Sequence, residues 1–179
     1  MRMTTVPGFG DESPTQGRAF QNALLELLPL VQFRHRELAA AHGISLTQCL
    51  ALRLWSEGRA LTVNDVAARL CLDKSTASRV VAGLEKKGCL VRTQDRDDGR
   101  IVWLEATPAG QRLRERIEND MASLYAELLS DFDQDIRSVM ARMLARLTGS
   151  FAARVRASGG TCRVVRGPLP HPQMSKKST

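Results

Sequence analysis

The segment from Leu61 to Gly110 constrains the fold of this chain more than any other part of the sequence. It reads LTVNDVAARLCLDKSTASRVVAGLEKKGCLVRTQDRDDGRIVWLEATPAG. Its apolar residues recur twice at helical spacing and then alternate, which predicts two helices followed by two strands. A helix, a tight turn, a second helix and a β-hairpin in this order form a winged helix-turn-helix. The sequence therefore predicts a mainly α fold that carries a small β-hairpin wing.

The ends of the two helices are marked by capping residues. Thr62 and Asp65 have the spacing of a capping box at the start of the first helix, whose apolar side is Val66, Ala67 and Leu70. A short turn around Cys71 and Leu72 follows. Asp73 is placed to cap the second helix, and Gly88 is placed to end it. The expected buried stripe of the second helix consists of Ala77, Val80, Val81 and Leu84.

The front of the second helix is rich in cations and short hydroxyl side chains. Helices of this kind enter the major groove of DNA with their N-terminal residues against the base edges. Backbone N–H groups at the same end attract phosphate. An ordinary capped helix with a solvated polar face is the alternative. The residues expected to face the major groove are Lys74, Ser75, Thr76, Ser78 and Arg79.

The predicted hairpin has strands over residues 89–93 and 100–106, joined by QDRDDG. Alternation along the second strand places Val102, Leu104 and Ala106 on one face and Ile101, Trp103 and Glu105 on the other. Arg96, Asp98 and Arg100 belong to the charged wing tip, and an arginine there can enter a minor groove. A solvated loop with internal ion pairs is the alternative, which the order of helix, turn, helix and hairpin disfavours.

These residues resemble the MarR family of bacterial transcription regulators. The shared features are the STASRVVAGLEKKG helix, the Asp98-x-Arg100 pair and the ATPAG segment, in which Ala106 replaces the usual leucine while Thr107 and Gly110 match. The resemblance implies that Asp98 holds Arg100 in position and that Arg100 enters the minor groove. It also implies a small-molecule pocket between the dimer helices and each winged head. The side chains considered for such a pocket, each of which has surface or packing as its alternative role, are Arg34, His35, Arg36, Arg53 and Trp55.

Long helices are expected on both sides of the winged head. One runs from about Ala19 to His42 with Pro29 inside it, another from about Thr47 to Glu57, and Thr107 and Pro108 open a third. That third helix carries an apolar stripe of Leu113, Ile117, Met121, Leu124 and Leu128. Asp133 is placed to cap the last helix, in which Phe151 ends the stripe. One winged domain cannot cover these stripes, so a twofold-related second copy is expected to do so. An intramolecular bundle is the alternative. The expected dimerisation residues are Phe20, Leu24, Leu27, Val31, Ile136, Met140, Met143 and Leu147.

The chain is expected to divide into three parts. These are a disordered N-terminus over residues 1–18, a winged helix domain over 19–156, and a disordered basic tail over 157–179. Within the domain the winged head spans about 45–106, and the dimerisation helices span 19–42 and 107–156. The net charge of +7 says little about DNA, because six basic and no acidic residues follow residue 148. No apolar run approaches the roughly 18 residues of a membrane span, so a cytoplasmic protein without a membrane partner is expected.

The sequence contains no recognisable catalytic or metal-binding motif. There is no phosphate loop, G-x-S-x-G or C-x-x-C spacing, so neither an enzyme nor a metal or other cofactor is expected. Cys49, Cys71 and Cys89 are most simply small core residues, and a redox-sensing thiol, best placed at Cys89, is the alternative. The expected function is that of a homodimeric repressor that binds a pseudo-palindrome in double-stranded DNA and responds to a small molecule. A winged helix that binds only proteins is the rival interpretation.

Overall fold

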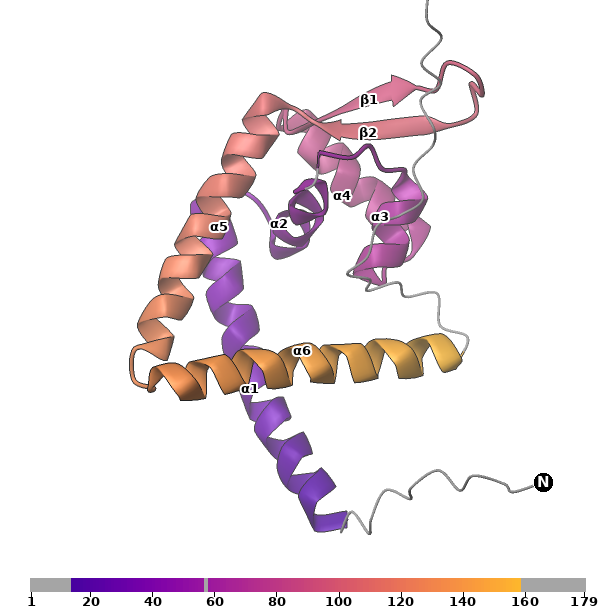
Figure 1. The fold of residues 1–179 in the computed structure, drawn as a ribbon. Helices are drawn as coiled ribbons and strands as arrows, with labels where there is room; N and C mark the ends of the chain where they lie inside the picture. The colour runs from indigo at the N-terminus through magenta and orange to yellow at the C-terminus, as the bar shows by residue number, and fades with distance from the viewer. Residues whose placement is uncertain (1–13, 57, 159–179) are drawn as a thin grey trace, which may run out of the picture. The chain divides into compact units, whose positions relative to one another are not determined.

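The computed structural model describes residues 14–56 and 58–158. Its order of elements matches the expected winged helix-turn-helix with flanking helices (Figure 1). Residues up to Leu46 form one compact unit, and the chain from Thr47 forms another. The elements are α1 (Pro14–Ala41), α2 (Leu46–Leu52), the 3-10 turn η1 (Arg53–Trp55), α3 (Val63–Leu70), α4 (Lys74–Lys86), β1 (Leu90–Gln94), β2 (Val102–Ala106), α5 (Pro108–Leu129) and α6 (Gln134–Ala157).

Two of the expected helix boundaries differ from those observed. Helix α1 begins at Pro14, so residues 14–18, which were expected to be disordered, are helical. Proline is well tolerated in a first helical turn because the N–H that it lacks has no intrahelical partner there. Helix α2 ends at Leu52 instead of Glu57 and tightens into η1, while Glu57 lies outside the described residues. The basic tail beyond residue 158 also lies outside them.

The caps predicted for the helix-turn-helix are confirmed. Asp65 N donates to Thr62 Oγ1 at 3.2 Å and Thr62 N donates to Asp65 Oδ2 at 2.8 Å, which completes the capping box of α3. Asp73 caps α4 through its side chain. The placement of Cys71 in the core was wrong. This residue is the left-handed C-cap of α3, with φ of 55°, and is exposed and disulfide-bonded, because a C-cap lies beyond the apolar face of its helix.

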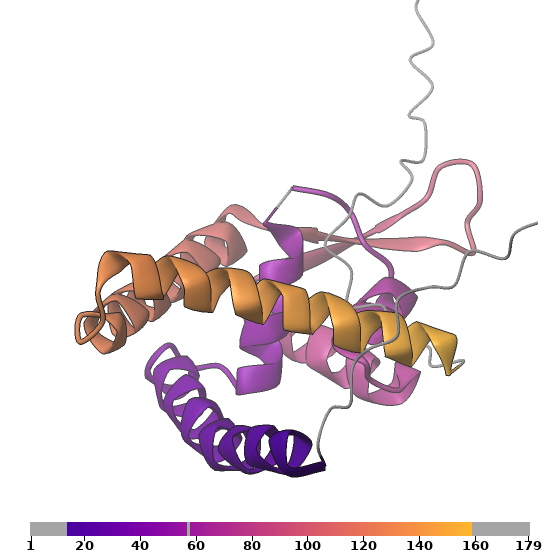
Figure 2. The ribbon, with the colours of Figure 1, turned by 60° about the horizontal axis from the view of Figure 1, so that its bottom comes forward.

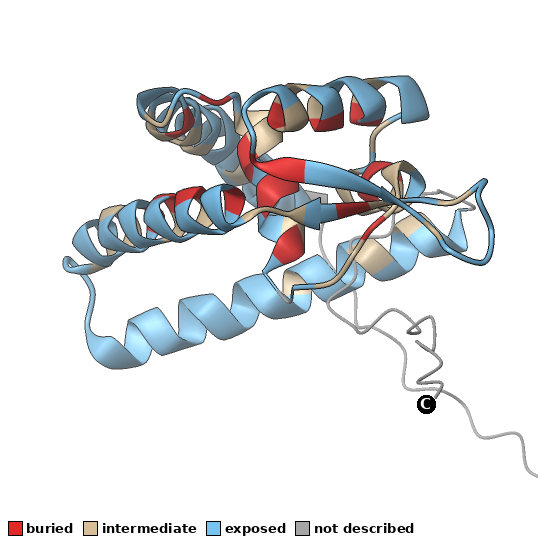
Figure 3. Cartoon of the chain, turned by 90° about the horizontal axis from the view of Figure 1, so that it is seen from above, coloured by how far each residue is buried: buried red, intermediate tan, exposed pale blue. Residues whose placement is uncertain are grey.

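The base of the wing is built into the core of the winged head. Leu104 of β2 is fully buried, and its carbonyl accepts hydrogen bonds from Leu61 N at 3.0 Å and from the indole Nε1 of Trp55 at 2.9 Å. Leu104 N donates in return to the Leu61 carbonyl at 2.7 Å. The buried positions gather where the helices meet the sheet (Figure 3). The core side chains of this unit include Cys49, Ala51, Leu52, Trp55, Leu61, Val66, Ala77, Val81, Leu84, Cys89, Leu90, Leu104, Leu113, Ile117 and Met121.

The hairpin is antiparallel and slightly shorter than predicted. Leu90 pairs with Ala106, Thr93 with Trp103 and Gln94 with Val102. The alternation along β2 holds at its centre, where Leu104 is buried, Trp103 is half-buried and Glu105 is exposed. It does not extend to Val102, which was expected on the face of Leu104 and is exposed. The loop between β1 and β2 projects away from α3 and α4 (Figures 1 and 2).

Close backbone packing joins the start of α5 to the start of the wing. Thr107 caps α5 as predicted: its Oγ1 accepts from Gly110 N at 3.0 Å and donates to the Gly88 carbonyl at 2.6 Å. Thr107 N also donates to the Cys89 carbonyl at 3.0 Å. A Cβ on Gly110 would overlap that same carbonyl oxygen. The T-x-x-G spacing is therefore explained by one cap and one close approach.

Helix α6 has no buried residue over its 24 positions, although it carries an apolar stripe (Figure 3). Asp133 occupies the predicted N-cap position, but its side chain makes no capping hydrogen bond. Leu128 near the end of α5 is also exposed. The large exposed side chains of α6 are Ile136, Val139, Met140, Met143, Leu144 and Phe151.

Candidate nucleic-acid interface

The predicted major-groove residues occupy the solvent side of the front of α4. Thr76 is half-buried and the other four are exposed, while Ala77, Val81 and Leu84 face the core. Helical spacing places Ser75 and Arg79 at the centre of the exposed face. The two faces of α4 are thus cleanly separated. The exposed members of the predicted set are Lys74, Ser75, Ser78 and Arg79.

Hydrogen bonds organise this front before any ligand is bound. Asp73 Oδ1 accepts from Thr76 N at 2.8 Å and from Ser75 Oγ at 2.5 Å. The hydrogen bonds from Ser75 and Thr76 hold the pKa of the Asp73 carboxyl well below its usual range. Arg79 Nη2 donates to Thr76 Oγ1 at 3.1 Å, which lays the guanidinium along the helix. The hydroxyl of Ser75 keeps its oxygen lone pairs as acceptors for an incoming donor.

Two further residues continue the exposed face of α4. Ala82 and Lys86 are exposed and follow Arg79 at spacings of three and seven residues. Neither Lys86 nor Ala82 was among the residues expected to face the major groove. Their helical positions relative to Ser75 could have identified them, because residues three or four apart share a helix face. A small side chain at 82 leaves room for a close approach to this face.

The wing tip keeps its arginine side chains available. Asp98 Oδ1 accepts a hydrogen bond from the backbone N of Arg100 at 3.0 Å. The resemblance implied that Asp98 holds Arg100 in position. The hydrogen bond in the structure joins Asp98 to the main chain of Arg100 and not to its guanidinium. Within the described part of the chain, no ion pair or hydrogen bond engages the guanidinium of either Arg96 or Arg100. Both side chains are exposed.

A residue that the sequence analysis did not single out organises the tip. Asp95 accepts hydrogen bonds from Asp97 N and Asp98 N, both at 2.9 Å, and from Trp103 Nε1 at 2.7 Å. These bonds, of which the one from Trp103 has the largest effect, lower the pKa of Asp95. An aspartate followed by polar turn residues is typical of an Asx turn, so the hydrogen bonds within the loop were predictable from the sequence. The hydrogen bond from Trp103 on the opposite strand was not.

An ion pair ties the wing to the recognition helix. Arg92 of β1 donates from Nε and Nη2 to the two carboxylate oxygens of Glu85 in α4, at 2.7 and 2.9 Å. The carboxylate raises the pKa of Arg92 further above its ordinary value. Two parallel N–H···O bonds fix the relative orientation of both groups. The bidentate pair therefore helps to hold β1 against the end of α4.

The side chains considered for a ligand pocket are divided between the two units, with Arg34, His35 and Arg36 in α1 and Arg53 and Trp55 in η1. Trp55 is a fully buried core residue whose indole is bonded to β2. Arg53 approaches Glu118 of α5 at 4.0 Å, and in α1 Arg34 pairs with Glu37 at 2.7 Å.

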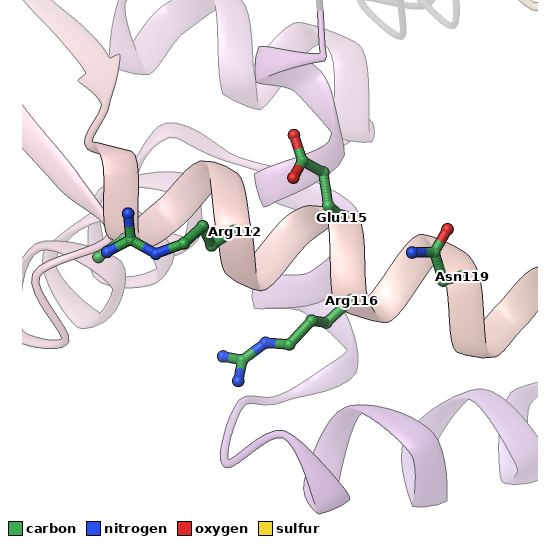
Figure 4. Close-up of a pocket in the computed structure, with 5 residues that line it drawn as sticks. Arg112, Glu115, Arg116 and Asn119 are labelled. Atoms are coloured by element: carbon green, nitrogen blue, oxygen red, sulfur yellow. The ribbon is translucent and has the colours of Figure 1, made fainter.

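A hollow of about 410 Å³ lies instead along α5 (Figure 4). Figure 4 shows Arg112 and Arg116 extending to one side of the helix and Glu115 to the other. The pattern of the sequence gave no sign of this hollow, because its lining side chains lie on the polar side of α5. They are Ala109, Arg112, Glu115, Arg116 and Asn119.

Cys49 and Cys89, the free cysteines in the part of the chain that the structure describes, are poor candidates for redox sensing. Cys49 and Cys89 are buried, and burial raises the pKa of each thiol despite the nearby Arg53 and Lys87. A thiolate is the reactive form, so this environment lowers reactivity. Among the residues that the structure describes, no three His, Cys, Asp or Glu side chains gather where they could bind a metal ion. No helix in the same part of the chain is long and apolar enough to cross a membrane.

These features define the class of protein as a winged helix-turn-helix. A model of the MarR family matches residues 42–101, which include the helix-turn-helix, β1 and the loop of the wing but not β2. Over these residues the chain is similar to the MarR family.

Two curated relatives align over most of their own length. The chain is 24% identical over 136 residues to the transcriptional regulator FarR of Neisseria gonorrhoeae, covering 75% of this chain and 93% of that protein. It is 20% identical over 122 residues to the homoprotocatechuate degradative operon repressor of Escherichia coli, covering 68% and 82% of the two chains.

Solved structures agree with the fold. A MarR family protein from Bacillus stearothermophilus matches with a TM-score of 0.72 and 22% identity, over 79% of this chain and 99% of that one. Staphylococcus aureus MarR, solved with salicylate and kanamycin, matches with a TM-score of 0.68 and 18% identity, over 77% and 93%. At these identities the likeness concerns the fold.

Proposed function

We propose that this protein is a homodimeric repressor that binds a pseudo-palindromic site in double-stranded DNA and releases it in response to a small anionic molecule. The observation that carries the proposal is the polar, exposed front of α4 combined with exposed arginines on a projecting wing. Both belong to one compact unit and are linked by the Glu85–Arg92 pair. A groove-binding helix and an adjacent minor-groove arginine need such a combination.

In the proposed complex, α4 enters a major groove. Arg79 exchanges its bond to Thr76 for a base edge or a phosphate, while Lys74 and Lys86 neutralise phosphate charge. The N–H groups at the start of α4 contribute the partial positive charge of a helix N-terminus. Arg96 and Arg100 then enter or border the neighbouring minor groove, where the negative potential favours guanidinium groups.

The apolar stripe of α6 supports a homodimer. Six large apolar side chains are exposed on one helix that buries none of its residues, and a contiguous exposed apolar stripe marks an interaction surface. Pairing with a second copy removes this surface from water. Two α4 helices related by a twofold axis can then face successive major grooves about 34–36 Å apart, as dimeric helix-turn-helix proteins require.

The hollow on α5 supports the response to a small anion. Arg112 and Arg116 place two guanidinium groups on one side of the helix, which suits a carboxylate or phosphate ligand. A ligand releases DNA only if it binds the DNA-incompetent arrangement of heads more tightly than the competent one. Salicylate and inorganic phosphate are the probes for this part of the proposal. If neither raises the thermal stability of the protein nor changes its tryptophan fluorescence, this part of the proposal fails.

To test the DNA proposal, the full-length protein is used to select duplexes from a random-sequence library, and the Kd for the enriched duplexes is measured. Arg79→Ala should cost about 1–3 kcal/mol and relax the preference at one base position. Arg100→Ala should weaken binding mainly through the minor groove. Arg142→Ala is the matched control, because it removes one charge from α6 on the side opposite the apolar stripe.

Retention of wild-type affinity by both the Arg79 and the Arg100 variants would show that the assignment of the interface is wrong. If the protein enriches no duplex at all, a winged helix that binds only proteins becomes the better interpretation.

A further inference from the structure

The tip of the wing is closed around the carboxylate of Asp95. This residue is half-buried, whereas the five that follow it are exposed. Oδ1 accepts from Asp97 N and Asp98 N, and Oδ2 accepts from the indole Nε1 of Trp103. Both oxygens are therefore occupied, and one of them connects the loop to the opposite strand.

Other hydrogen bonds complete the closure of residues 95–101. Asp95 N donates to the Ile101 carbonyl at 3.0 Å, and Ile101 N donates to the Asp98 carbonyl at 2.9 Å. Gln94 Nε2 donates to the Gly99 carbonyl at 2.7 Å. A loop with this many internal bonds loses less conformational entropy when it docks, because it is ordered beforehand.

We propose that Asp95 and Trp103 form a latch that positions the arginines of the wing for the minor groove. The latch is the hydrogen bond from Trp103 Nε1 to Asp95 Oδ2, and the arginines are Arg96 and Arg100. This inference rests on the proposed DNA-binding function and adds two positioning residues to it. Asp95 acts through the backbone of the loop and contacts no DNA itself.

A control substitution in the same loop separates the loss of the latch from the effect of removing a negative charge. A carboxylate close to DNA repels phosphate, so neutralising it should by itself tighten binding. Asp97 belongs to the same loop, and its side chain makes no recorded hydrogen bond in the part of the chain that the structure describes. Asp97→Asn therefore reports the charge effect alone. Asp95→Asn adds the loss of the latch to that effect.

The Asp95→Asn substitution breaks the latch selectively. An asparagine keeps one carbonyl oxygen to accept from Asp97 N and Asp98 N, so the turn itself can persist. Its amide NH₂ then faces the indole N–H of Trp103, and two donors cannot bond. Trp103→Phe removes the donor from the other strand and tests the same bond independently.

The experiment uses the full-length protein and a fluorescein-labelled duplex recovered with the wild-type protein from a random-sequence library. Fluorescence anisotropy gives the Kd of each variant at matched salt. We expect Asp97→Asn to bind as tightly as wild type or more tightly, and Asp95→Asn and Trp103→Phe to bind about 3- to 10-fold more weakly. Asp95→Asn should cost less in the Trp103→Phe background, because the two changes remove one interaction.

Indole N–H signals in a ¹H–¹⁵N spectrum give a readout independent of DNA. The protein has two tryptophans, and Trp103→Phe identifies the signal of Trp103. Asp95→Asn should shift this signal and Asp97→Asn should leave it in place. The Trp103→Phe data carry the test if the Asp95 variant does not fold.

The possible failures are distinguishable. If wild type binds the duplex while Asp95→Asn and Asp97→Asn change the Kd equally, or the indole signal does not move, the latch is overturned and the DNA-binding function stands. If no duplex is recovered, the DNA-binding function falls and the positioning role with it.

Discussion

Replacing Gly110 by alanine should destabilise this protein, although alanine is the better helix former. In an exposed helix the change stabilises by about 1 kcal/mol per chain. At Gly110 the new Cβ would overlap the carbonyl oxygen of Cys89 and lie 2.9 Å from its carbonyl carbon. The obstacle is backbone, so no side-chain rotation can relieve it, and either α5 or the start of the wing must move.

The expected magnitude follows from two opposing contributions. Overpacking of this kind costs about 1–3 kcal/mol. Moving the Cys89 carbonyl also weakens its 3.0 Å bond from Thr107 N, for about 1 kcal/mol more. After the gain in helix propensity, the free energy of unfolding should fall by about 1–3 kcal/mol.

Urea unfolding followed by circular dichroism measures this change, and one fixed protein concentration is used because the proposed association would contribute to stability. Gly149→Ala is the control, because a Cβ at Gly149 meets nothing within 4 Å and the residue lies on the side of α6 away from the apolar stripe. It should be neutral or stabilising. A Gly110→Ala protein as stable as the Gly149→Ala protein would refute the close-approach argument.

Three further predictions concern charge and association. The hydrogen-bonded carboxyl of Asp73 has a pKa lowered from an ordinary value of 3.8, so its contribution to stability is fully present above that value and is lost as the pH falls below it. The stability difference between wild type and Asp73→Asn, measured by urea unfolding, should therefore shrink on acidification below pH 3.8, and a constant difference would contradict it. Glu85→Gln should lower the free energy of unfolding by less than about 1 kcal/mol, because Arg92 is 41% exposed. The loss should be smaller still in 1 M salt, which screens the ion pair. A loss that salt does not change would argue against the ion pair. Replacing Met143 and Leu144 by glutamate should give a monomer in light scattering at micromolar concentration, and an unchanged dimer would remove α6 from the interface.

Local signals in the sequence predicted much of the winged head because they act over a few residues. Thr62 and Asp65 face each other across one helical turn, and Asp73 and Thr107 lie at the starts of helices, so their capping roles need no distant partner. The alternation around Leu104 indicated which face of β2 is buried for the same reason. The position of Cys71 was missed because an apolar residue beside a helix end is not distinguished by spacing from one on its buried face.

Tertiary structure alone decided the contacts between residues far apart in the chain. Trp55 was considered for a ligand pocket, yet its indole is bonded to the carbonyl of Leu104, a partner that periodicity cannot specify. The bond from Trp103 to Asp95 depends on the register of the hairpin, and the need for glycine at 110 depends on how closely α5 approaches Cys89. The sequence by itself determined the kind and order of the elements, because propensity, capping and alternation are properties of neighbouring residues. Which side chains meet depends on the packing of those elements, which brings residues that are distant in the sequence within bonding distance.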